Sequence, residues 1–150
     1  ALMPSLVEQV TTLAESTGSR VRLVGWSLGG FLAREVSRDA PDVVERVVTL
    51  ASPIVGGPKY TLAAGPYRRR GYDMDEMERM VAERDEVPLS VPVTSFYSKR
   101  DGVVAWQASI DRTNEGVEHV EVSATHWSIG FIPEVLRPVA ELMATPDRAV

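Results

Sequence analysis

The feature of this sequence that most constrains its fold is an apolar segment that runs into a serine between glycines, Val21-Arg22-Leu23-Val24-Gly25-Trp26-Ser27-Leu28-Gly29-Gly30. The valines and leucine before the serine predict a buried strand, and the pattern after it predicts a helix. A sharp strand-to-helix turn exposes a serine and holds it rigidly, as a nucleophile requires, and the small Gly25 and Gly29 would allow that bend. The alternative is a strand–helix turn whose glycines serve only packing.

The rest of the chain alternates between helical and strand patterns. Alternation of this kind indicates right-handed crossovers and a parallel sheet. We therefore expect an α/β fold in one domain over residues 1–150, with about four strands side by side in sequence order and flanking helices. The predicted helices cover residues 4–17, 28–38 and 133–143, and the predicted strands begin near Val21, Val43, Pro92 and Val117.

Residues 54–90 form a long insertion between the second and third predicted strands. Asp73 and Glu76 have the spacing of a helix capping box. The helix that follows carries one apolar stripe. The stripe either packs this helix on the core or belongs to a cap whose flexible methionines face an acyl chain. Its members are Met74, Met77, Met80 and Val81.

An acid and a base follow the later strands. Asp101 comes after the strand at 92–97 and precedes a glycine, and Asp111 is the reserve candidate for the acid. The chain has two histidines, of which His126 lies in a loop beyond the last strand and His119 lies within that strand. We therefore expect Asp101 and His126 to be the acid and base, and His119 to be a solvated or hydrogen-bonded surface residue.

The carboxyl ends of neighbouring parallel strands meet at one edge of a sheet, where functional groups are commonly presented. Ser27, Asp101 and His126 would meet there as a catalytic triad of nucleophile, acid and base. The backbone N–H of Leu28, at the start of the helix, would donate to the oxyanion of the reaction. Three tryptophans adjoin these residues or their loops and are expected to line an apolar substrate pocket: Trp26, Trp106 and Trp127.

In these residues the sequence resembles the α/β-hydrolase superfamily, and more narrowly its bacterial lipase and esterase branch. The resemblance extends to Leu50-Ala51-Ser52-Pro53, to Asp101-Gly102, and to the His126 loop that leads to Pro133-Glu134-Val135-Leu136, as in the C-terminal half of actinobacterial lipase-like hydrolases. It implies a partial α/β-hydrolase fold with a cap-like insertion, and hydrolysis of a small acyl ester or lipid through an acyl-enzyme. An acyltransferase with the same triad, or a non-catalytic fragment or interaction module, remains an alternative.

Domains of this superfamily have several strands before the serine turn, and a loop among them supplies a second oxyanion donor. Here one predicted helix precedes Val21, and no corresponding motif is present. We therefore expect the resemblance to cover about half of such a domain and turnover to be weak, since one lost oxyanion donor costs about 10²–10³ in rate. The strand at Val21 is expected to have an open edge that pairs with a second copy or a complementing chain.

Composition excludes several other classes of function. The 150 residues include no cysteine and carry a formal net charge of −5. Without cysteine there is no thiolate nucleophile or cysteine zinc site, and two histidines are few for a metal centre, so we expect no metal and no cofactor. An acidic chain lacks the basic face that nucleic acid requires. There is no apolar run long enough for a membrane span and no signal-peptide pattern, which leaves cytoplasmic and secreted locations open.

Overall fold

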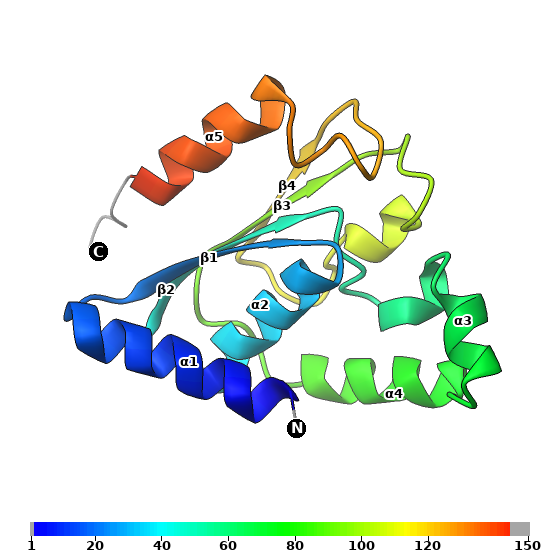
Figure 1. Cartoon of the computed structure of the whole chain (residues 1–150), viewed down its shortest axis with the longest axis horizontal. Helices are drawn as coiled ribbons and strands as arrows, with labels where there is room; N and C mark the ends of the chain where they lie inside the picture. Colours follow the sequence, from blue (N-terminus) through cyan, green and yellow to red (C-terminus); the bar gives the residue numbers. More distant parts are fainter. Residues whose placement is uncertain (1, 145–150) are drawn as a thin grey trace.

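The computed structural model describes residues 2–144 as a parallel sheet with helices on both faces (Figure 1). The strands are β1 (Val21–Trp26), β2 (Val44–Leu50), β3 (Val93–Tyr97) and β4 (Val117–Glu121). The α-helices are α1 (Leu2–Thr17), α2 (Leu28–Asp39), α3 (Ala64–Arg69), α4 (Met74–Asp85) and α5 (Pro133–Ala144), with 3-10 turns η1 (Gly57–Tyr60) and η2 (Trp106–Ser109). Within residues 2–144, no helix combines the length and the apolar character needed to cross a membrane.

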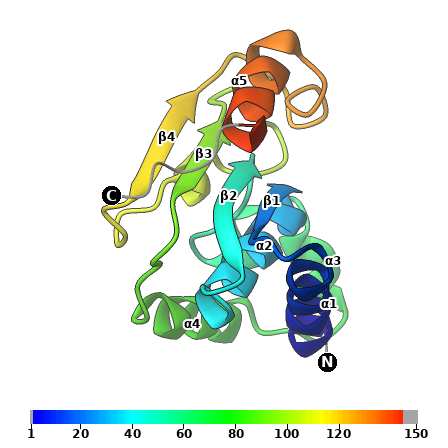
Figure 2. The same ribbon diagram turned by 90° about the vertical axis from the view of Figure 1, so that its left-hand side faces the viewer.

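The sheet has the predicted strand order, β1-β2-β3-β4, and all its pairs are parallel. Figure 2 shows the four strands side by side, with β1 at one edge and β4 at the other. Val24 is paired with Val48, and Val48 with Thr94. The carboxyl ends of all four strands therefore lie at one edge of the sheet, and the loops beyond them carry Ser27, Asp101 and His126.

Two apolar layers enclose the sheet. On one face α5 packs on β2 and β3, and on the other α2 packs on β1 and β2, with α1 beside it (Figure 1). Burying each large apolar side chain of these layers stabilises the fold by about 1.5–3 kcal/mol. The first layer includes Val48, Phe96, Val135 and Val139, and the second includes Val36, Val44, Val47 and Val93.

The insertion over residues 54–90 folds as η1, α3 and α4. The Asp73 side chain accepts hydrogen bonds from the Asp75 and Glu76 amides, so the Asp73 half of the predicted capping box is present. The methionine stripe divides, because Met74 is buried whereas Met80 is 58% exposed. The interpretation that the stripe packs on the core therefore applies to its first residue and not to Met80.

Buried ion pairs attach the end of α4 to α2. Arg34 and Arg38 of α2 both bind Oδ1 of Asp85, at 2.9 and 2.7 Å. Arg34 also lies 2.6 Å from Asp111, in the loop after η2. Removing one partner from such a group leaves an uncompensated buried charge, which costs several kcal/mol. These pairs therefore keep the last turn of α4 against the core.

Candidate active site

Ser27 occupies a strained turn between β1 and α2. Its backbone angles are φ 53° and ψ −125°, a region that side-chain-bearing residues rarely adopt. The turn is fixed because the Ser27 amide donates to the Leu50 carbonyl at 2.8 Å, while the Ser27 carbonyl accepts from Gly30 at 3.1 Å. The structure thus has the sharp serine turn that the sequence predicts.

Two glycines make this turn possible. A Cβ on Gly25 would lie 2.3 Å from the Gly29 carbonyl oxygen, and a Cβ on Gly30 would lie 2.0 Å from Ser52 Oγ. A Cβ on Gly29 would meet no atom within 4 Å. The expectation that Gly25 and Gly29 permit the bend is therefore correct for Gly25 and wrong for Gly29, and Gly30 is the second glycine that the turn requires.

Asp101 and His126 form a buried pair. His126 Nδ1 lies 2.8 Å from Asp101 Oδ2, and the two side chains are 4% and 2% exposed. The other carboxylate oxygen, Oδ1, accepts from the amides of Val103 and Val104 at 2.8 and 2.9 Å. These three contacts hold the carboxylate in one orientation. A neutral His126 that donates from Nδ1 to Asp101 has Nε2 left as an acceptor.

The loop that carries His126 extends from the end of β4 back to the end of β1. Ser98 Oγ donates to the Ala124 carbonyl at 2.6 Å and accepts from the Ala124 amide, which fixes the start of the loop beside β3. Trp26 Nε1 donates to the His126 carbonyl at 3.1 Å. The histidine therefore contacts the residue that directly precedes Ser27. No hydrogen bond joins the Ser27 hydroxyl to His126 in the described part of the chain.

Aromatic side chains surround the histidine. Trp26 and Trp127 lie 5.7 and 5.6 Å from the His126 ring between centroids, and Trp26 also contacts Phe131 at 6.2 Å. Trp127 is 68% exposed and Phe131 is 72% exposed. This exposed apolar surface is part of the histidine loop, and of its two residues only Trp127 was predicted from the sequence.

Trp106 lies apart from the other two tryptophans. Its ring stacks on Tyr97 at 5.9 Å, and Lys99 Nζ lies 5.4 Å from its centroid. Over residues 2–144 it makes no ring contact with Trp26 or Trp127. The structure therefore brings two of the three predicted pocket tryptophans together and separates the third.

The reserve residues have other partners. Asp111 is buried against Arg34, and Asp111 Oδ1 accepts from the Thr113 and Asn114 amides. His119 Nε2 accepts from the Asp111 amide at 2.9 Å. His119 is thus hydrogen-bonded, as predicted, and neither residue contacts Asp101 or His126 through a hydrogen bond among those that the structure describes.

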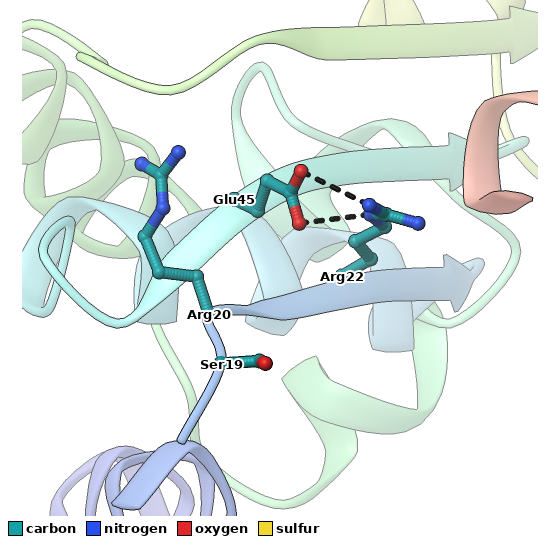
Figure 3. Close-up of a pocket in the computed structure, with 4 residues that line it drawn as sticks. All are labelled: Ser19, Arg20, Arg22 and Glu45. Carbon is teal, nitrogen blue, oxygen red and sulfur yellow. Dashed lines mark hydrogen bonds and ion pairs between the residues drawn. The ribbon is translucent and has the colours of Figure 1, made fainter. Parts of the chain in front are cut away.

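Two hollows among the described residues lie away from Ser27, Asp101 and His126. One lies at the amino end of β1, the end opposite Ser27, and is lined by Ser19, Arg20, Arg22 and Glu45 (Figure 3). There Arg22 Nε pairs with Glu45 at 2.9 Å. Another, of about 710 Å³, lies between α4 and η2, with Val81 and Ala108 in its lining. No group of three or more His, Asp or Glu residues in the described chain is arranged to hold a metal ion.

The chain resembles solved structures of hydrolases, although no protein-family model and no curated protein matches it. A monoacylglycerol lipase of Paleococcus ferrophilus has a TM-score of 0.67 and 16% identity, with 95% of this chain and 75% of that chain covered. A carboxylesterase of Bacillus subtilis has a TM-score of 0.67 and 18% identity, with 95% of this chain and 67% of that chain covered. Mouse alpha/beta hydrolase domain-containing protein 10 has a TM-score of 0.63 and 16% identity, with 95% of this chain and 68% of that chain covered. The covered share of these chains is larger than the half that the sequence suggested. The chain therefore has a partial α/β-hydrolase fold, structurally similar to that of lipases and esterases.

Proposed function

We propose that the chain is a serine hydrolase that cleaves carboxylic esters through Ser27, Asp101 and His126. The observation that carries the proposal is the buried His126–Asp101 hydrogen bond of 2.8 Å, in a loop that Trp26 ties to the strand of Ser27. The strained conformation of Ser27 supports it, since such strain is commonly found at functional residues. The structural similarity to lipases and esterases is consistent with this chemistry.

In the proposed reaction, His126 Nε2 accepts the Ser27 proton as Ser27 Oγ attacks the ester carbonyl. The Leu28 amide, at the start of α2, lacks an intrahelical partner and donates to the oxyanion that forms. The imidazolium, stabilised by Asp101, then protonates the departing alcohol, which leaves an acyl-enzyme. Water, activated by the same histidine, hydrolyses this intermediate and regenerates Ser27.

The apolar surface beside the site supports an acyl or lipid substrate. Trp127 and Phe131 are exposed next to the histidine. An acyl chain bound along them would remove apolar surface from water, which favours binding. We assign Trp26 and Trp127 to this part of the site. The position of Trp106, against Tyr97, gives it no evident part in binding the acyl chain.

Reaction with a fluorophosphonate, followed by intact-mass measurement, tests the proposal, because an activated serine reacts far faster than an ordinary one. We expect one adduct on the wild-type chain and none on Ser27→Ala. His126→Ala and Asp101→Asn should each lower the labelling rate by orders of magnitude. Ser19→Ala is the matched control, since Ser19 is an exposed serine at the other end of β1, and it should label as the wild type does.

A wild-type chain that labels no faster than Ser27→Ala would refute the proposal and favour a non-catalytic role. Formation of a new ester when an alcohol is added to the reaction would instead identify an acyltransferase that uses the same three residues.

A further inference from the structure

Trp26 makes a contact that connects the serine strand with the histidine loop. Its indole N–H donates to the His126 carbonyl at 3.1 Å, although the two residues are far apart in the sequence. Its ring also lies 5.7 Å from the His126 ring, at an interplanar angle of 35°. Backbone and ring of the histidine are therefore both in contact with the residue beside Ser27.

Hydrogen bonds from residues that follow β3 also orient the histidine loop. Asp101 binds His126 Nδ1, and Ser98 binds the backbone of Ala124. Both residues follow β3, two strands away from β1. These bonds fix the histidine relative to β3, whereas Trp26 fixes it relative to the strand that carries Ser27.

We propose that Trp26 is a positioning residue that sets the distance between His126 and Ser27, an inference that rests on the proposed function. The site must keep Ser27 Oγ within hydrogen-bond reach of His126 Nε2 although the two residues follow strands at opposite edges of the sheet. The indole spans this separation with a directional hydrogen bond and a rigid ring. Misplacement of a catalytic group by about 1 Å costs about 10²-fold in rate.

Trp26→Phe is the decisive variant, because it keeps an aromatic ring beside Trp127 and Phe131 while it removes the N–H donor together with one ring of the indole. We expect kcat for a small soluble ester to fall by about 10²-fold with little change in KM. The effect should disappear in a His126→Ala background, because Trp26 acts through that histidine. Trp106→Phe is the matched control: Trp106 stacks on Tyr97 and makes no ring contact with His126 among the described residues, and kcat should stay near the wild-type value.

An unchanged kcat in Trp26→Phe, or an equal loss with and without His126, would overturn the inference.

A nuclear magnetic resonance measurement tests the role of Trp26 separately from the proposed function. The ring ¹⁵N resonances of His126 should shift or broaden in Trp26→Phe while those of His119, which binds the Asp111 amide elsewhere, stay in place. Unchanged His126 resonances would overturn the role of Trp26 even if Ser27 is inert, and an inert wild-type Ser27 with shifted resonances would refute the proposed function alone.

Discussion

At the scale of single residues, Asp101 and Asp111 accept the same pattern of backbone hydrogen bonds and differ in the distant side chain that each binds. Each uses Oδ1 to accept the amides two and three positions later, Val103 and Val104 for Asp101 and Thr113 and Asn114 for Asp111. The Oδ2 atom of Asp101 binds His126, whereas that of Asp111 binds Arg34. The role of each aspartate is therefore decided by a side chain from a distant element.

The candidate site could be predicted from the sequence only in part. Ser27, Asp101 and His126 could be named as candidates because each follows a strand, and the parallel sheet orders the strand ends. The hydrogen bond from Trp26 to His126 was not, because nothing local to either residue marks the other as its partner. The ion pairs of Asp111 were missed for the same reason.

Asp111→Asn should lower stability and leave Ser27 reactivity intact. Burial alone would raise the pKa of Asp111, but hydrogen bonds from Arg34 and from the Asn114 and Thr113 amides outweigh it and lower the pKa from 3.8 to about 2. A shift of this size corresponds to roughly 2 kcal/mol of unfolding free energy, and Arg34 loses one buried ion partner while it keeps Asp85 and Glu35. Urea unfolding measures the loss of stability, and fluorophosphonate labelling measures the reactivity of Ser27.

The stability difference between the wild type and Asp111→Asn should also depend on pH. The pKa of Asp111 is lower in the folded chain than in the unfolded one. Its contribution to the free energy of unfolding is therefore complete above about pH 4 and is lost as the pH falls toward 2. The stability difference between wild type and Asp111→Asn should shrink over that interval. A difference that stays constant, or a variant that loses labelling, would contradict the structural role of Asp111.

At the scale of elements, the predicted helices and strands agree with the structure to within one or two residues at their ends. Local apolar periodicity and turn residues determine these boundaries. The burial of Arg34, Glu35 and Arg38 on α2 was not predictable in this way. A charged helix face normally indicates solvent, and here the ion partners that allow its burial come from α4 and from the loop at Asp111.

The ion pairs at the end of α4 lead to a prediction about proteolysis of the insertion. In the wild type, trypsin should cut first at the exposed Arg68–Arg70, at the end of α3, because α4 is attached to α2. Asp85→Asn removes the charge that both buried arginines bind, which should cost several kcal/mol. We expect this variant to become susceptible at Arg79 and Arg84 as well.

Asp75→Asn is the control for this experiment. Asp75 also pairs with a cation, Lys59 at 2.7 Å, but its side chain is 79% exposed, and exposed pairs contribute little. The tryptic pattern should match that of the wild type. First cleavage within α4 of the unaltered chain would show that these ion pairs do not fix α4.

At the scale of the whole molecule, the edge of the sheet at β1 is open in the described chain. The amides of Val21 and Ser27 donate toward β2, each at 2.8 Å. Because backbone groups alternate along a strand, those of Val24 and Trp26 point away from β2. Val24 is 47% exposed on this edge, and Trp127 and Phe131 add exposed apolar surface where β1 ends.

An open apolar edge is a template for pairing with another strand, so we expect two copies of the chain to associate through antiparallel β1 strands centred on Val24. In that register Val24 faces its own copy, and the outward groups of Trp26 find partners across the twofold axis. Val24→Lys places two like charges side by side at the axis and should give a monomer in sedimentation at micromolar concentration, whereas the β-branched Val24→Thr should still pair. A monomeric wild type, or association that Val24→Lys leaves unchanged, would mean that β1 is not the contact.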